Sequence, residues 1–286
     1  METSTACFAQ VRAGYSSRAA SSTTKHVFWL LLLVVCLTLV GVEAQAQDFG
    51  YGHGTALIVL RTPKALYAAV DSKETSRVYR DGVPTDGESL MCKIRRVGPY
   101  YSFVSGVARG TNGFDALQEV ASLYTPGDDL EKLAAATRES VPRMLTPLLK
   151  MMLDADPANF AKTYVGSAAL QLALVGKEQN APKVVVVEFQ AAATAQGTVT
   201  LTSRTMSCPG DCTFPATGYF LGAHDAMEQS ARQNPAILAK PNEDGIEKLI
   251  GLEYNSRPDI VGGPISMLKV GPSGPTVLRS GVCALN

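Results

Sequence analysis

Histidine is scarce in this chain of 286 residues: it occurs at only three positions, His26, His53 and His224. A zinc site needs several histidine or cysteine ligands at suitable spacing, and three scattered histidines do not supply them. No other cofactor motif is present, so we expect neither a metal nor a cofactor. Any catalysis would have to use other side chains.

An excess of charge is also missing. Lysine and arginine number 26, as do aspartate and glutamate; residues 1–46 hold three and two of these, which leaves 23 and 24. Such a balance lacks the electrostatic attraction that draws basic proteins to nucleic acid or anionic lipid. We expect no nucleic-acid partner, and no membrane contact once the leader is removed.

Long apolar runs are absent after residue 46. The one such run before it, Val27–Val42, follows three basic residues and precedes the small-x-small sequence Ala44-Gln45-Ala46. This pattern is typical of a cleavable secretory signal peptide over residues 1–46. The alternative is an uncleaved membrane anchor, for which 16 residues are short against the roughly 20 that a span needs. We expect a secreted or periplasmic protein, soluble after cleavage.

Four of the six cysteines follow the leader: Cys92, Cys208, Cys212 and Cys283. An even number in an exported protein favours disulfide bonds over metal ligation. Cys208 and Cys212 flank a Pro-Gly turn and can close a small loop. By elimination, Cys92 would pair with Cys283.

The first part of the remaining 240 residues reads as strands. Short apolar runs at Thr55–Leu60 and Leu66–Val70 predict one hairpin, and Met91–Val97 with Tyr100–Ser105 predict a second. The polar stretch Asp81–Glu88, with its glycines and proline, predicts a loop between them.

Later segments alternate between helical and extended patterns. Apolar residues at three- and four-residue spacing predict helices at Asn112–Tyr124, Asp128–Asp154 (broken or kinked at Pro142 and Pro147), Asp225–Ala239 and Glu243–Asn255. Apolar runs predict strands at Ala168–Gly176, Lys183–Gln190, Thr198–Arg204, Tyr219–Leu221, Ile265–Val270 and Thr276–Leu278. Paired helices between groups of antiparallel strands favour a single α+β domain with helix layers covering the sheets.

Several short motifs occur together in an informative order. Gly54-Thr55 is followed after sixteen residues by Asp71-Ser72-Lys73, then by Lys93-Ile94 and Ser105-Gly106, and near the C-terminus by Val261-Gly262-Gly263-Pro264-Ile265. Their order and spacing resemble the proteasome β-subunit branch of the N-terminal nucleophile (Ntn) hydrolases. The resemblance covers nearly everything after residue 53 and implies that family's four-layer αββα sandwich of antiparallel sheets.

The resemblance also implies processing. In the family a Gly-Thr bond is cut autocatalytically, which here would remove residues 47–54 as a short propeptide and leave 55–286 as the domain. The implied substrate is a peptide or small amide. A homo-oligomer stays open, since the family's ring assembly does not carry over safely to an exported protein.

Four residues carry the implied chemistry. Thr55 would be the nucleophile, and its free α-amine, with a pKa of about 7.7–8.0, would be the base. Lys93 would lower the pKa of the hydroxyl, and Asp71 would neutralise that lysine. The Gly106 N–H would meet the oxyanion, an interaction worth roughly 3–4 kcal/mol.

Each of these residues also has an ordinary structural interpretation. Thr55 would then be a strand-edge threonine that is never freed. Asp71 would be a strand-end turn residue, and Lys93 a solvated edge lysine.

The sequence departs from the family at the groups that normally orient the threonine amine. The family's Gly-Ser-Gly turn is Gly222-Ala223-His224, without the hydroxyl. Val261 and Pro258 take the places of a serine and an aspartate, with Asp259 one residue away. Two hypotheses follow: an exported threonine-type Ntn hydrolase, or a catalytically inactive Ntn-fold module used for binding or assembly.

Overall fold

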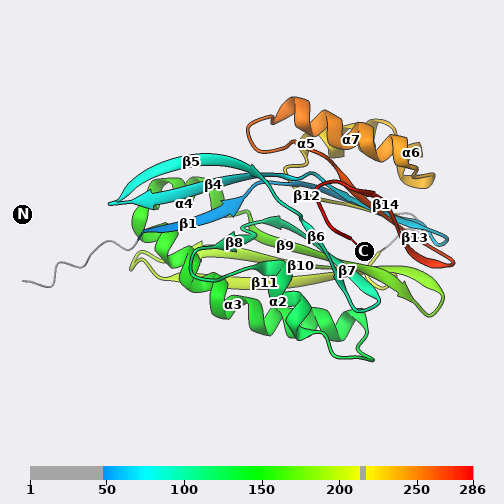
Figure 1. The fold of residues 1–286 in the computed structure, drawn as a ribbon, viewed down its shortest axis with the longest axis horizontal. Coiled ribbons are helices and arrows are strands. Elements are labelled where there is room, and N and C mark those ends of the chain that lie inside the picture. Colours follow the sequence, from blue (N-terminus) through cyan, green and yellow to red (C-terminus); the bar gives the residue numbers. More distant parts are fainter. Residues whose placement is uncertain (1–47, 213–216, 286) are drawn as a thin grey trace, which may run out of the picture. The chain divides into compact units, whose positions relative to one another are not determined.

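The computed structural model describes residues 48–212 and 217–285, and the expected signal peptide lies outside them. These described residues belong to one compact unit. Its paired strands run antiparallel in three sheets, and helices lie above and below them (Figure 1). The predicted α+β class is confirmed.

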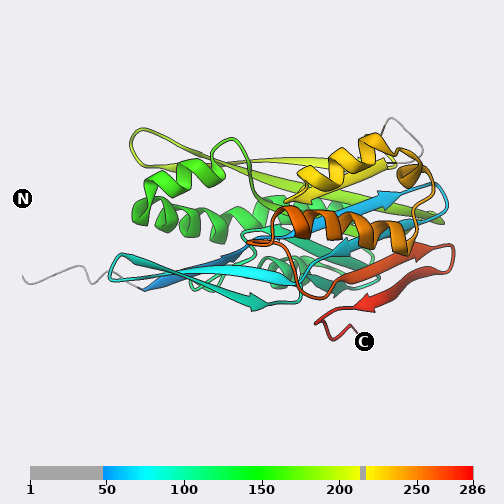
Figure 2. The ribbon, with the colours of Figure 1, turned by 90° about the horizontal axis from the view of Figure 1, so that it is seen from above.

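A four-stranded sheet has the order β5-β4-β1-β8. Its strands are β1 (Phe49–His53), β4 (Lys73–Arg80), β5 (Val83–Leu90) and β8 (Arg109–Gly110). β1 lies beside the β4–β5 hairpin in both ribbon views (Figures 1 and 2). The sequence pattern did not predict β1.

The predicted loop over Asp81–Glu88 is wrong, because most of it belongs to this hairpin. Asp81 and Gly82 form its tip with φ of 49° and 76°, the left-handed pair that a two-residue Asp-Gly turn adopts. All eight residues of β5 are exposed, so the strand has no apolar alternation to reveal it.

Two five-stranded sheets form the centre of the unit. One has the order β11-β10-β9-β7-β6, with β6 at Ile94–Val97, β7 at Tyr100–Gly106, β9 at Ala168–Glu178, β10 at Ala181–Ala193 and β11 at Val199–Cys208. The other has the order β12-β2-β3-β13-β14, with β2 at Ala56–Arg61, β3 at Leu66–Val70, β12 at Thr217–Gly222, β13 at Ser266–Gly271 and β14 at Gly274–Ser280.

The described helices are α2 (Ala116–Leu123), α3 (Leu130–Ala155), α4 (Pro157–Tyr164), α5 (Asp225–Gln233), α6 (Ala236–Ala239) and α7 (Glu243–Ser256). One apolar cluster joins the two five-stranded sheets, for example through Leu57 of β2 and Phe103 of β7. A second packs α2, α3 and α4 on the outer face of one sheet, and a third packs α5 and α7 on the other.

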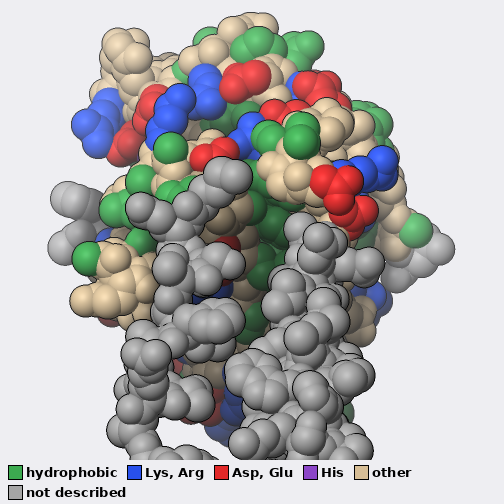
Figure 3. Space-filling model, turned by 90° about the vertical axis from the view of Figure 1, so that its left-hand side faces the viewer, with side chains coloured by type: hydrophobic (Ala, Val, Ile, Leu, Met, Phe, Trp, Pro, Cys, Tyr) green, Lys and Arg blue, Asp and Glu red, His purple; other side chains and the backbone are tan. Residues whose placement is uncertain are grey.

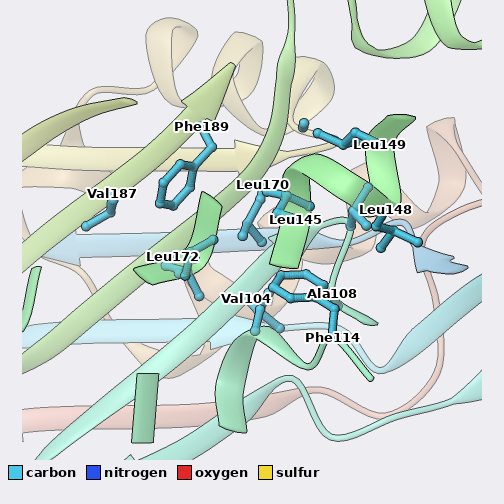
Figure 4. Close-up of a cluster of buried hydrophobic side chains, with 14 of the residues drawn as sticks. Val104, Ala108, Phe114, Leu145, Leu148, Leu149, Leu170, Leu172, Val187 and Phe189 are labelled. Atoms are coloured by element: carbon cyan, nitrogen blue, oxygen red, sulfur yellow. The ribbon is translucent and has the colours of Figure 1, made fainter. Parts of the chain in front are cut away.

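Helix α3 shows how the outer packing is made. Leu145, Leu148 and Leu149 lie close to the sheet residues Leu170 and Phe189 (Figure 4). Buried side chains of this kind occur along the whole of α3, which is one continuous helix.

Ten buried side chains anchor α3, which continues through Pro142 and Pro147. A break at these prolines is therefore wrong, and a kink there stays a prediction. The helix predicted over 225–239 is instead two. α5 ends at Gln233 because Pro235 restricts Asn234 and cannot continue a helix. α4 follows α3 as a separate short helix that the pattern did not predict.

Both predicted disulfides are present. Cys92 joins Cys283 across 191 residues of sequence, and Cys208 joins Cys212. The first bond ties the residue before Lys93 to the C-terminal segment.

Within residues 48–212 and 217–285, no helix has the length and hydropathy of a membrane span. On the face seen in Figure 3, cationic and anionic side chains of the described residues are intermingled. That part of the surface therefore has no large patch of positive or of negative charge.

Candidate active site

Thr55 lies where β1 ends and β2 begins. Its side chain is buried, and its hydroxyl donates a hydrogen bond to the carbonyl oxygen of Gly54. Its own carbonyl accepts from the Ala223 N–H at 2.8 Å. Gly54 adopts φ +90°, a conformation that glycine reaches without strain. The Thr55 side chain and the Thr55 carbonyl are therefore each held by a hydrogen bond.

Asp71 is brought beside Thr55 by the β2–β3 hairpin, whose register pairs Val70 with Leu57. The buried carboxylate accepts from the Ala56 N–H at 3.0 Å and from the Gly262 N–H at 2.9 Å. The Gly-Gly turn singled out in the sequence thus holds this carboxylate.

Lys93 precedes β6 and is buried. Its ammonium donates to Gly54 O at 2.8 Å, to Asp71 Oδ1 at 3.0 Å and to the carbonyl of Lys73. Three acceptors match the three protons of an ammonium group. The structure therefore brings Thr55, Asp71 and Lys93 together: the Thr55 hydroxyl and the Lys93 ammonium share the Gly54 carbonyl oxygen as acceptor, and Asp71 pairs with Lys93.

Burial disfavours the charged forms of both Lys93 and Asp71. Burial lowers the pKa of the Lys93 amine, against the opposing attraction of Asp71. Burial likewise raises the pKa of the Asp71 carboxyl, against Lys93 and the backbone donors of Gly262 and Ala56. Each group depends on the other, because removing one leaves the second buried without its counter-charge.

Gly106 ends β7 on the wall of the same cavity as Thr55. Its φ is +89°, and a Cβ there would collide with the carbonyl oxygen of Ala169. Only glycine fits this backbone. Its role as an oxyanion donor stays a prediction.

The cavity beside Thr55 has a volume of about 750 Å³. It is lined by backbone at the β1–β2 junction and by charged side chains from the sheet, from α5 and from the end of α7. These are Glu188, Arg204, Asp225, Glu228, Glu253 and Arg257. Apolar and aromatic side chains also line it, among them Met206, Phe220 and Ile260, so the cavity is mixed in character.

A hydrogen-bonded chain on the cavity wall was missed in the sequence. The Gly222 N–H donates to Gln171 Oε1 at 2.9 Å, and Gln171 Nε2 donates to Glu188 at 2.7 Å. Arg204 pairs with Glu188 at 2.9 Å. Burial raises the pKa of the Glu188 carboxyl, but the bonds from Arg204 and Gln171 outweigh it and hold the pKa below its usual value.

The sequence feature that could have indicated these hydrogen-bonded residues is a polar residue inside an otherwise apolar strand. Gln171 interrupts the apolar run of β9, and Glu188 follows four valines in β10. Charged residues are seldom buried without a partner, so these positions could have been selected from sequence.

Gly222 and Ser105 face Thr55 from the other side. A Cβ on Gly222 would collide with the Thr55 carbonyl and would lie 2.5 Å from Ser105 Oγ. Ser105 is buried, and its hydroxyl has no hydrogen-bond partner among the described residues. Ala223 supplies a backbone N–H but no hydroxyl here.

The other departures from the family pattern have contacts of their own. Val261 packs in an apolar cluster with residues of α7. Asp259 is exposed and pairs with Arg257 at 3.2 Å, and the Pro258 carbonyl accepts from Lys73. The Asp259 carboxylate therefore already has a partner in Arg257.

The two histidines of the described residues have different surroundings. His53 ends β1 at the cavity, and burial lowers its pKa. His224 accompanies the start of α5, with Nδ1 2.6 Å from the Gly222 carbonyl oxygen. Among the described residues no group of three histidine, cysteine or acidic side chains could hold a metal ion.

Comparison with protein-family models and with curated protein sequences finds no match for this chain. The case for its function therefore depends on the geometry described above.

Proposed function

We propose that the chain is an exported, threonine-type Ntn hydrolase that cleaves amide bonds in a peptide or small amide after freeing Thr55. One observation carries the proposal. The Lys93 ammonium donates to the carbonyl oxygen of Gly54 at 2.8 Å, and the hydroxyl of Thr55, the proposed nucleophile, contacts the same carbonyl. A cationic donor at a carbonyl oxygen stabilises the negative charge that forms there when the carbon is attacked.

The arrangement of layers supports the family assignment. Helices cover the outer faces of two sheets that pack on each other, the order expected of a four-layer αββα sandwich. Two disulfides support export, since such bonds persist in oxidising compartments.

The first reaction in this proposal is a self-cut. Thr55 Oγ attacks the Gly54 carbonyl carbon, and the Gly54–Thr55 C–N bond breaks as the hydroxyl proton passes to the departing nitrogen. The product is an ester that joins Gly54 to Thr55 Oγ. Water then hydrolyses the ester, which yields a Gly54 carboxylate and restores the Thr55 hydroxyl next to its new α-amine.

Turnover of a substrate would repeat this chemistry. The α-amine takes the hydroxyl proton while Thr55 Oγ attacks the substrate carbonyl, and the proton goes to the leaving amine. Water hydrolyses the acyl ester. Lys93, held by Asp71, lowers the pKa of the Thr55 hydroxyl and so favours its alkoxide. The Gly106 N–H is the proposed donor to the oxyanion that forms on the substrate carbonyl.

The second candidate is an Ntn-fold module without catalysis, used for binding or assembly. The observation that favours it is the loss of orienting hydroxyls at Ala223 and Val261, together with the exposed side chain of Asp259. In that case the Gly54–Thr55 bond stays intact.

The test compares the purified protein with Thr55→Ala on a panel of peptide and small-amide substrates. The hydrolase proposal expects hydrolysis that disappears in the variant, with unchanged thermal stability as evidence of folding. Equal hydrolysis by both proteins would favour the non-catalytic module, and so would hydrolysis by neither when denaturing mass spectrometry also shows an intact Gly54–Thr55 bond.

A further inference from the structure

The segment that the proposed cut would detach is an interior strand. β1 pairs with β4 from Phe49↔Tyr79 to His53↔Thr75. On its other edge it pairs with β8, and the Ala108 N–H donates to the Gly52 carbonyl at 3.0 Å. Both edges of β1 are therefore hydrogen-bonded.

Two aromatic side chains anchor β1 in the core. Phe49 and Tyr51 are 6% and 4% exposed and belong to the cluster under α3 and α4. Phe49 stacks on Tyr79 with ring centroids 4.8 Å apart. Buried aromatic side chains contribute strongly to packing, so these two rings hold β1 in the core.

An ion pair crosses the strand. Glu74 of β4 and Arg109 of β8 join over Gly52, with Arg109 Nε 2.7 Å from Glu74 Oε1. Glu74 is 1% exposed, and a Cβ on Gly52 would collide with its carboxylate. Glycine at position 52 is what lets this pair close over β1.

The cut breaks one covalent bond and none of these contacts. We propose that the slot between β4 and β8 is a peptide-binding site that retains residues 47–54 as a non-covalent strand after the cut. The inference rests on the proposed function. The new Gly54 carboxylate then lies at the Lys93 ammonium, which already donates to Gly54 O at 2.8 Å.

This contact inhibits the freed enzyme. A carboxylate binds an ammonium more strongly than a neutral carbonyl does, because the hydrogen bond is charge-assisted. It also occupies the space next to Thr55 where a substrate carbonyl has to arrive. The active form is the one from which β1 has left the slot, and the ligand of the slot is an extended peptide with aromatic residues at alternate positions.

Mass spectrometry separates this inference from the proposed function. The full exported protein is passed through a desalting column and measured under native and under denaturing conditions. Retention predicts a native mass that includes 47–54 and a denatured sample that shows two chains. A cut protein that has lost the peptide overturns the inference, and a single uncut chain overturns the proposed function.

Hydrogen exchange tests the slot without any cut. In Thr55→Ala, the amides of β1 should exchange as slowly as those of β9 and β10. Exchange at least a hundredfold faster would mean that β1 is loosely held and would overturn the inference.

Activity provides the last readout. Arg109→Ala opens the ion pair over Gly52 and should raise turnover several-fold, together with loss of the peptide on desalting. The matched control is Lys150→Ala, which removes the Lys150–Asp154 pair within α3. Equal turnover of Arg109→Ala and the control contradicts inhibition by β1.

Discussion

The Lys93 ammonium donates a hydrogen bond of 2.8 Å to the carbonyl oxygen of Gly54. These residues are 39 positions apart in sequence: Gly54 lies between β1 and β2, and Lys93 comes directly before β6. The carbonyl belongs to the peptide bond that precedes Thr55. A buried cation placed on this one bond is the feature on which the functional account depends.

The pairing of Asp71 with Lys93 predicts unequal effects of single and double substitutions. Asp71→Asn or Lys93→Met alone leaves a buried charge unpaired and should lower the free energy of unfolding by about 3–5 kcal/mol. The double variant should recover most of that loss, because a neutral pair needs no counter-charge. Urea unfolding measures the stability of all three.

The same variants separate stability from chemistry. None of the three should be cut at Gly54–Thr55 when examined by denaturing mass spectrometry. A double variant that is both stable and cut would remove Lys93 and Asp71 from the mechanism.

Gly222 should tolerate alanine much less well than another glycine of the same backbone conformation. A Cβ at Gly222 (φ +72°) collides with the Thr55 carbonyl, whereas Gly113 (φ +87°) has nothing within 4 Å. Gly113→Ala should cost only the left-handed conformation, roughly 1–2 kcal/mol. Gly222→Ala should cost more and stop the cut, as measured by thermal unfolding and by intact mass.

His53 should make stability depend on pH. Burial, and then Arg77, lowers its pKa below the ordinary 6.5. As the pH falls below 6.5 the unfolded chain binds a proton that the folded chain does not, so the free energy of unfolding falls. The decrease cannot exceed about 1.4 kcal/mol per pH unit from one group.

Urea unfolding between pH 7.5 and 5.5 checks this. His53→Gln should lose most of the dependence. A dependence that is unchanged in His53→Gln would contradict a lowered pKa of His53 in the folded protein.

The two disulfides should contribute unequally. Cys92–Cys283 closes a loop of 191 residues and Cys208–Cys212 one of four. Loop entropy gives the first about 5 kcal/mol and the second about 2 kcal/mol. Paired Cys→Ser variants, measured by urea unfolding, should differ in that order, and equal losses would mean that strain or residual structure dominates.

The sequence predicted the parts of the site that depend on local pairing. Thr55 and Asp71 flank one hairpin, so the register of β2 and β3 places them together. Lys93 is separated from that hairpin by β4 and β5, and only the resemblance placed it nearby. β5 is exposed along its whole length, which leaves no hydrophobic period to detect.

β1 was missed for a different reason. Its sequence, FGYGH, alternates aromatic residues with glycines, and glycine is poor at forming strands by itself. The glycines serve long-range contacts, such as the passage of Glu74 over Gly52. Contacts of that kind depend on the tertiary fold and leave no local pattern.

The most direct test of the account is the N-terminal residue of the folded protein, purified after expression of the full chain, as determined by Edman degradation. The account predicts two sequences in equal amounts, one that begins at Gln47 and is eight residues long, and one that begins at Thr55. A single sequence from Gln47 that continues through Gly54 into Thr55 would contradict it.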